Sequence, residues 1–296
     1  MEKRSRAFVR SVVAASVTAL VAGTVGVPAA SAAPEDEAIW EEGNVSWIAD
    51  GDTLIANLDT GPGILGTQRV RTIGVNAPET GECGAAQAEG RLRSVLPKGS
   101  RVQTRALDVA SYDDYSGGRI ARSLYARDQE GNWYDTSRNS VSDGLLLWFP
   151  LSAASSSKPE YAHNLEYRVL ADDAAAERRG IWSANLCGSS PYPNADLRVW
   201  AKYWGTEEVY VENRSSFAVD LSGWTLRDES SSNRYRFPTG TVLPSGDRLQ
   251  IRTGCGPGDG LAWCSDGPVW SNGGDTVLLL DALGNVAARR RYPGAG

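Results

Sequence analysis

Helix-forming sequence in this 296-residue chain stops at residues 188–195, and only strand-like sequence follows. The stretch is rich in Gly, Ser and Pro and has no periodicity, which is typical of a linker between folded units. The length of the chain also fits about two domains. We therefore expect a mixed α+β domain over residues 43–187 and an all-β domain over residues 196–296.

The first domain has the pattern of a small barrel with appended helices. Short runs that alternate or stay apolar between turn residues predict strands, and turn-free runs rich in Ala, Glu, Arg and Leu predict helices. The expected strands are residues 45–49, 53–58, 69–74, 101–107 and 119–126, and the expected helices are residues 83–96, 137–147 and 163–179. This order of elements indicates an α+β fold.

The second domain repeats short strands with Gly or Pro between them. The expected strands are residues 209–213, 224–228, 235–237, 248–252 and 276–281. Trp224 is expected in the core of this domain. Arg289–Arg291 is expected to be a solvated edge.

The N-terminus has the pattern of a secretory signal peptide over residues 1–32. Basic residues precede an apolar run, and Ala30-Ser31-Ala32 is a small-residue cleavage site. The alternative is an uncleaved membrane anchor, which the Gly, Ser and Thr within the run disfavour. Residues 33–42 are acidic and predict a disordered lead-in.

Composition narrows the possible chemistry. The formal charge of −6 argues against nucleic-acid binding through a general positive field. His163 is the only histidine, which excludes catalysis by two imidazoles, and the cysteines lack the CxxC spacing of zinc sites. Hydrolysis by this chain would therefore depend on carboxylates and a metal ion.

Four cysteines in an exported chain predict two disulfides, for which three connectivities are possible. Cys83 and Cys187 bracket most of the first domain, and Cys255 and Cys264 flank a Gly-rich loop. We expect the cysteines to pair in this way.

Three motifs in the first domain carry the groups that metal-assisted phosphodiester cleavage requires. They are Asp50-Gly51-Asp52-Thr53, Arg71-Thr72-Ile73-Gly74-Val75-Asn76-Ala77-Pro78-Glu79 and Gly117-Gly118-Arg119. Together they supply paired acidic oxygens, one further carboxylate and two guanidinium groups, which match pairs of phosphate oxygens. Each motif alone also fits a plain turn, a buried strand or a solvated arginine. Their occurrence in order favours the functional interpretation.

These motifs, with the closing Arg178-Arg179-Gly180-Ile181-Trp182, resemble the thermonuclease, or staphylococcal nuclease-like, family over about Val45–Trp182. The resemblance implies an OB-fold barrel with appended helices. It also implies calcium-dependent cleavage of DNA or RNA that leaves 3′-phosphate ends. In this family pattern Asp52, Asn76 and the backbone carbonyl of Ala77 would bind Ca²⁺ directly, and Asp50 would act through water.

The resemblance assigns the remaining roles in the same way. Glu79 would be the general base or would orient the attacking water, and Arg71 and Arg119 would clamp the phosphate. Tyr115 would stack a base of the substrate. Trp148 and Phe149 are further stacking candidates, for which core packing is the alternative.

Two positions depart from the family pattern. Asn76 stands where the type member has Asp, which removes one negative charge and is expected to weaken calcium binding. The run Tyr115-Ser116-Gly117-Gly118-Arg119 is longer than the usual Tyr-Gly-Arg. Arg122 is therefore an alternative to Arg119 as the second phosphate clamp.

The second domain is similar to the lamin-tail domain from about Asp196 to Tyr292. The resemblance rests on Val209–Asn213, Val219–Asp228, Phe237-Pro238 and Gly274–Gly284. It implies an immunoglobulin-like sandwich without catalysis. Substrate capture, surface attachment and stabilisation are all open as its role.

The sequence thus predicts a secreted, monomeric, calcium-dependent nuclease for DNA or RNA, without a membrane segment after signal cleavage, and released or retained at the cell envelope. The alternative is a non-catalytic nucleic-acid-binding protein in which Asn76 marks the loss of the ion. An extracellular scaffold is a third, less favoured interpretation.

Overall fold

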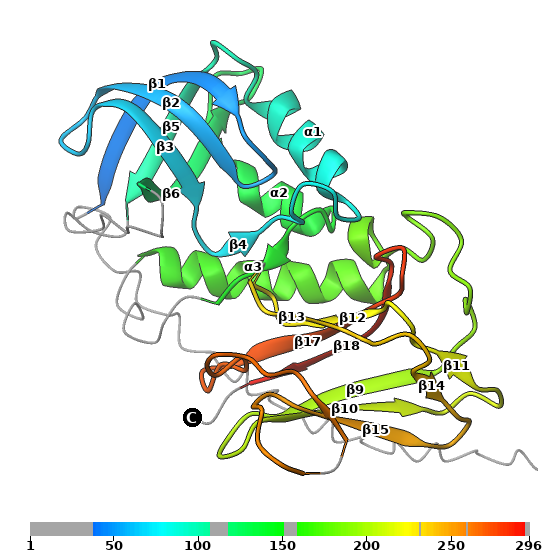
Figure 1. The fold of residues 1–296 in the computed structure, drawn as a ribbon. Coiled ribbons are helices and arrows are strands. Elements are labelled where there is room, and N and C mark those ends of the chain that lie inside the picture. The colour runs from blue at the N-terminus through cyan, green and yellow to red at the C-terminus, as the bar shows by residue number, and fades with distance from the viewer. Residues whose placement is uncertain (1–37, 107–117, 151–158, 231, 259, 294–296) are drawn as a thin grey trace, which may run out of the picture. The chain divides into compact units, whose positions relative to one another are not determined.

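The structure is a computed structural model that describes residues 38–106, 118–150, 159–230, 232–258 and 260–293 (Figure 1). These residues all belong to one compact unit, Ala33–Gly296. The predicted signal peptide and Tyr115 lie outside the described residues.

Five strands in the described part of the first domain close into an OB-like barrel (Figure 1). They are β1 (Ile39–Ile48), β2 (Thr53–Thr60), β3 (Gly66–Thr72), β5 (Arg101–Ala106) and β6 (Arg119–Arg127). Neighbours pair antiparallel in the order β3-β2-β1-β5-β6, and a parallel pairing of β3 with β6 closes the barrel. Alternate residues such as Leu54, Ala56 and Leu58 point inward and form its core. The expected barrel is confirmed.

Strand β1 begins earlier than the sequence indicated. Residues 39–42, which were expected to belong to a disordered lead-in, pair with β5. Glu41 is fully buried there and accepts hydrogen bonds from Arg122 and Thr104. One of the acidic residues that suggested disorder is therefore a buried carboxylate, and it has hydrogen-bond donors inside the barrel. Burial acts to raise the pKa of Glu41, but the hydrogen bonds from Arg122, Thr104 and Ile64 outweigh it, so the pKa lies below its ordinary value.

Three α-helices among the described residues accompany the barrel. They are α1 (Ala85–Val95), α2 (Thr136–Ser142) and α3 (Pro159–Ala176). The helix expected over residues 137–147 ends at Ser142 because Gly144 has a φ of 70° and turns the chain into β8 (Leu147–Trp148). Strand β8 pairs with β4 (Val75–Asn76). The short β7 (Trp133–Asp135) extends the sheet beside β6.

The closing motif of the first domain forms a tight crossing. Gly180 begins a 3-10 helix, η3 (Gly180–Trp182), and the N–H of Ile181 donates to the carbonyl of Gly144. A Cβ atom at Gly180 would lie 2.2 Å from that carbonyl oxygen. Only glycine fits where the two segments approach this closely.

The second domain is rich in β-structure and is consistent with an immunoglobulin-like fold. One sheet contains β9 (Leu197–Lys202), β10 (Glu208–Asn213), β15 (Arg248–Arg252) and β16 (Leu261–Ala262), and the other contains β12 (Thr225–Arg227), β13 (Arg234–Arg236), β17 (Asp275–Leu280) and β18 (Val286–Tyr292). A short pair joins β11 (Val219–Asp220) and β14 (Val242–Leu243). Trp224 is 1% exposed in a core that both sheets share, as expected. Strands β9, β11, β14, β16 and β18 were not predicted.

Both expected disulfides are present, Cys83–Cys187 and Cys255–Cys264. The segment after Cys187 is not a free linker. Asn285 of the β17–β18 turn accepts from the N–H of Cys187 and donates to the carbonyl of Gly188. The ring of Tyr192 packs against Phe217. The two domains are therefore joined by fixed contacts in the stretch that was expected to separate them.

The domains also share an interface beyond this segment. Leu278 of β17 packs into an apolar cluster with Leu147, Ala174, Ile181 and Trp182 of the first domain. Arg289 and Arg291 pair with Asp172 of α3. The prediction of a solvated edge was wrong for these two arginines, because the alternation of β18 turns them both toward α3.

Among the described residues, no helix has the length and apolarity needed to cross a membrane.

Candidate functional site

One cavity of about 520 Å³ gathers most of the predicted site residues. Its lining includes Asp50, Asp52, Arg71, Asn76, Glu79 and Arg119. The three sequence motifs therefore meet at one place on the barrel. Arg69, Phe149, Ser230 and Ser232 line the same cavity and were not predicted as site residues, except that Phe149 was a stacking candidate.

The closure of the barrel explains why the arginines meet. Strands β3 and β6 run parallel and place Arg69 opposite Arg119 and Arg71 opposite Ala121. Residues two apart on a strand share a face, so Arg69 and Arg71 both face the cavity. This alternation was visible in the sequence and could have identified Arg69.

The glycine of the first motif allows close packing rather than a special backbone angle. A Cβ atom at Gly51 would lie 2.5 Å from the Cβ of Ala88 in α1 and 2.9 Å from that of Ala77. Helix α1 therefore lies directly against the turn that carries Asp50 and Asp52.

Asp52 is 5% exposed and is held by several donors. Its Oδ2 accepts from the N–H of Ala77 at 2.6 Å and lies 3.2 Å from Nη2 of Arg71. Its Oδ1 accepts from the hydroxyl of Thr53 at 2.9 Å. Burial raises the pKa of Asp52 to about 6, with the charge of Arg71 opposing and that of Asp50 adding to the rise.

Asp50 lies next to Asp52 in the same turn, where its Oδ1 accepts from the N–H of Asp52 at 3.0 Å. Asp50 is more accessible than Asp52, and it lines the cavity.

Several oxygen atoms at this site surround the guanidinium group of Arg71. Nη2 of Arg71 donates to Oδ1 of Asn76 and to the carbonyl of Val75, both at 2.8 Å, and also lies beside Asp52. No group of three or more His, Cys, Asp or Glu side chains suited to a metal occurs in the described residues. The oxygens that could face a cation here are the carboxylates of Asp50 and Asp52 and the neutral oxygens of Asn76 and Val75. In this structure Arg71 contacts those of Asp52, Asn76 and Val75. An oxygen-only donor set is of the kind that Ca²⁺ accepts and that softer metal ions do not prefer.

Ala77 contacts Asp52 through its backbone N–H. The expected contact of its backbone carbonyl with the ion stays a prediction. The backbone oxygen that joins the cluster around Arg71 is that of Val75.

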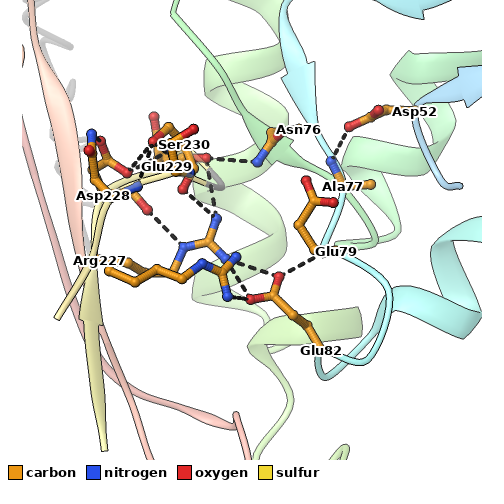
Figure 2. A network of polar contacts seen from close by, with 12 residues as sticks. Asp52, Asn76, Ala77, Glu79, Glu82, Arg227, Asp228, Glu229 and Ser230 are labelled. Atoms are coloured by element: carbon orange, nitrogen blue, oxygen red, sulfur yellow. Dashed lines mark hydrogen bonds and ion pairs between the residues drawn. The ribbon is translucent and has the colours of Figure 1, made fainter. Parts of the chain in front are cut away.

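Asn76 is 4% exposed and uses both ends of its side chain. Its Oδ1 accepts from Arg71. Its Nδ2 donates to the backbone carbonyl of Glu229 at 3.0 Å, the contact that Figure 2 marks. Glu229 belongs to the second domain. The sequence contains no signal for this contact, because a backbone acceptor can belong to any residue type.

Glu79 is exposed and lines the cavity. Figure 2 shows its carboxylate directed toward Asn76 and Ala77, away from Glu82. Its backbone N–H donates to Oε2 of Glu82 at 2.7 Å. The carboxylate is therefore available to a bound substrate while the backbone is fixed.

The two candidates for the second arginine have different surroundings. Arg119 is partly exposed and lines the cavity, whereas Arg122 is 2% exposed and donates to Glu41 through Nε and Nη2 at 2.7 and 3.0 Å. Arg122 is thus committed to the barrel interior. The geometry favours Arg119 as the arginine that can meet a ligand.

The aromatic candidates divide in a similar way. Trp148 is 6% exposed, belongs to an apolar core cluster and has the guanidinium of Arg291 over its ring at 4.7 Å. Phe149 lines the cavity. Tyr115 is outside the described residues.

Comparison with known proteins identifies the second domain. Residues 191–294 match the Lamin Tail Domain family. A search of curated proteins found no match to the chain. The chain therefore contains a lamin-tail domain, which follows an OB-like barrel.

Proposed function

We propose that this chain is a calcium-dependent nuclease that hydrolyses phosphodiester bonds of DNA or RNA. The observation that carries the proposal is the single cavity that Asp50, Asp52, Glu79, Arg71 and Arg119 line. Binding alone would need the arginines of this set, but it would not need the exposed carboxylate of Glu79 beside the buried carboxylate of Asp52.

Each group has a chemical task in this proposal. Asp52 and Asn76 would hold Ca²⁺, with Asp50 close by. When bound, the ion would polarise a phosphoryl oxygen and organise the attacking water. Glu79 would accept a proton from that water, and Arg71 and Arg119 would donate to the charge that develops on the phosphate.

The family resemblance further suggests 3′-phosphate products. The chain's disulfides fit an oxidising compartment, so we propose that the protein is secreted. We also propose that it acts as a monomer.

The proposal is tested by cleavage of single-stranded DNA and of RNA by the purified protein, with Ca²⁺ and then with excess chelator. The Glu79→Gln variant is expected to lose about a hundredfold or more in kcat, because it cannot accept a proton. Glu130→Gln is the matched control, since Glu130 is an exposed glutamate in the turn after β6, outside the cavity lining.

Calcium-dependent cleavage that is lost in Glu79→Gln and retained in Glu130→Gln supports the proposal. If DNA is bound but stays intact with Ca²⁺ present, the chain is a nucleic-acid-binding protein and the enzymatic proposal fails.

A further inference from the structure

We propose that the lamin-tail domain is part of the catalytic site, because a loop of this domain, described at residues 227–230 and 232–234, positions the Asn76–Glu79 segment from both ends. The catalytic meaning of this inference rests on the proposed nuclease function. The contacts themselves are independent of it.

The first contact fixes the amide of Asn76 (Figure 2). Because Nδ2 donates to the carbonyl of Glu229, Oδ1 must face Arg71 and the cavity. Aspartate could not make the same pair of contacts, since an ionised carboxylate has no N–H to donate. Asparagine is therefore the residue that can present an oxygen to the ion site and a donor to the lamin-tail domain.

The second contact fixes the other end of the segment. Glu82 accepts from the N–H of Glu79 and pairs with Nη1 of Arg227 at 3.2 Å and with Arg234. Both arginines belong to the lamin-tail domain, and Arg227 is 3% exposed. The backbone of Glu79 is thus connected to the second domain through one carboxylate.

Arg227 also supports the loop that holds Asn76. Its Nε donates to the carbonyl of Asp228 and its Nη2 donates to that of Ser230, both at 3.0 Å. Nη2 also reaches the carbonyl of Glu229 at 3.4 Å. One guanidinium therefore lies between the acceptor of Asn76 and the carboxylate that holds Glu79.

Hydrogen bonds between residues of the loop itself stabilise it. Asp228 accepts from the N–H of Ser230 at 2.9 Å and from Nδ2 of Asn233 at 2.6 Å. Ser230 and Ser232 then form the part of the cavity wall that the lamin-tail domain supplies. A shift of this loop would move the proposed ion ligand, the proposed base and the wall together.

The test compares full-length Glu82→Ala, Glu82→Gln and Asp172→Asn with the wild type. Glu82→Ala removes the link between Glu79 and Arg227. Glu82→Gln keeps an oxygen that can accept from the N–H of Glu79 and from Arg227. Asp172→Asn is the matched control, because Asp172 pairs with Arg289 and Arg291 across the same domain interface but does not contact the Asn76–Glu79 segment. Arg291 also pairs with Glu229 at 3.5 Å, and the substitution leaves both members of that pair in place.

Two measurements are made on each variant. Hydrogen exchange reports local opening in peptides that cover residues 76–79 and 228–233. Steady-state kinetics at saturating Ca²⁺ separate kcat from KM. We expect Glu82→Ala to speed exchange in both peptides and to lower kcat about tenfold to a hundredfold with little change in KM, since small misplacements of catalytic groups have effects of this size. We expect Glu82→Gln to recover most of both losses and Asp172→Asn to resemble the wild type.

Unchanged exchange in either peptide of Glu82→Ala overturns the inference, as does an equal kcat loss in Asp172→Asn. If the wild type cleaves nothing, the proposed function fails, and exchange alone decides the positioning. Faster exchange in both segments then upholds it, and unchanged exchange refutes it.

Discussion

Asn76 contacts a different half of the chain with each end of its amide, and this makes the effect of an Asp at position 76 predictable. Charge alone would predict stronger calcium binding in Asn76→Asp. The geometry predicts the opposite, because a carboxylate oxygen would replace the donor that now lies 3.0 Å from the carbonyl of Glu229. The buried carboxylate oxygen would face that carbonyl oxygen with no donor between them, and a buried acceptor left without a donor costs about 1–3 kcal/mol.

We therefore expect Asn76→Asp to lower the free energy of unfolding by about that amount and to reduce cleavage. Urea unfolding, calcium titration by calorimetry and kcat check this. Asn57→Asp, at an exposed position on β2, controls for the added charge. Tighter calcium binding at unchanged stability would contradict the expectation.

At the scale of elements, the contact between α1 and the Asp50–Asp52 turn predicts that Gly-to-Ala substitutions at two positions change the free energy of unfolding in opposite directions. Gly51→Ala would place a Cβ 2.5 Å from that of Ala88, so we expect a loss of about 1–3 kcal/mol. Gly90 is exposed in the same helix, and a Cβ atom there would meet nothing within 4 Å, so Gly90→Ala is expected to gain about 0.5–1 kcal/mol.

Thermal and urea unfolding of the two variants check this pair. Gly51→Ala is also expected to reduce cleavage, because Ala77 lies 2.9 Å from the added methyl and anchors Asp52. A Gly51→Ala protein as stable and as active as the wild type would show that α1 does not restrict this turn.

Helices and strands could be predicted where the pattern lies in residues that are neighbours along the chain. The barrel strands alternate clearly, and the ordered motifs identified most of the cavity lining. The helix expected over residues 137–147 was too long because Gly144 was not recognised as its end. Strand β18 was missed because three consecutive arginines look solvated, although Arg289 and Arg291 contact α3.

The contribution of the second domain to the site could not be predicted. Asn76 and Glu229 are separated by 153 residues, and the acceptor is a backbone atom. Periodicity and motif spacing report neighbours along the chain, so they contain no information about which loop of a second domain covers a cavity of the first.

For the whole molecule, buried carboxyl groups in the lamin-tail domain predict how stability depends on pH. Burial raises the pKa of Glu229 from 4.5 to about 8, with Arg291 opposing, and burial raises that of Asp275 from 3.8 to about 7. The folded state thus binds these protons more tightly than the unfolded state does. Their contribution to stability is complete below about pH 4 and is lost as the pH rises through 7 and 8.

We expect the melting temperature to fall between pH 6 and pH 9. In Glu229→Gln the fall should be smaller, because the amide stays neutral at every pH. Each such group contributes at most about 1.4 kcal/mol per pH unit. Asp266→Asn, at an exposed position, is the control. A melting temperature that is flat in the wild type, or an equal slope in Glu229→Gln, would refute the assignment.

The junction around Cys83–Cys187 has a consequence for the inheritance of the two domains. Gly284 of the lamin-tail domain approaches Cys83 so closely that a Cβ atom would lie 2.9 Å from that of the cysteine, and Asn285 holds the chain directly after the bridge. Recombination within residues 188–195 would join a barrel to a foreign partner that lacks matching residues at these positions. The two domains of such a chimera would pack poorly at their junction. We therefore expect the two domains to be inherited together and to diverge together.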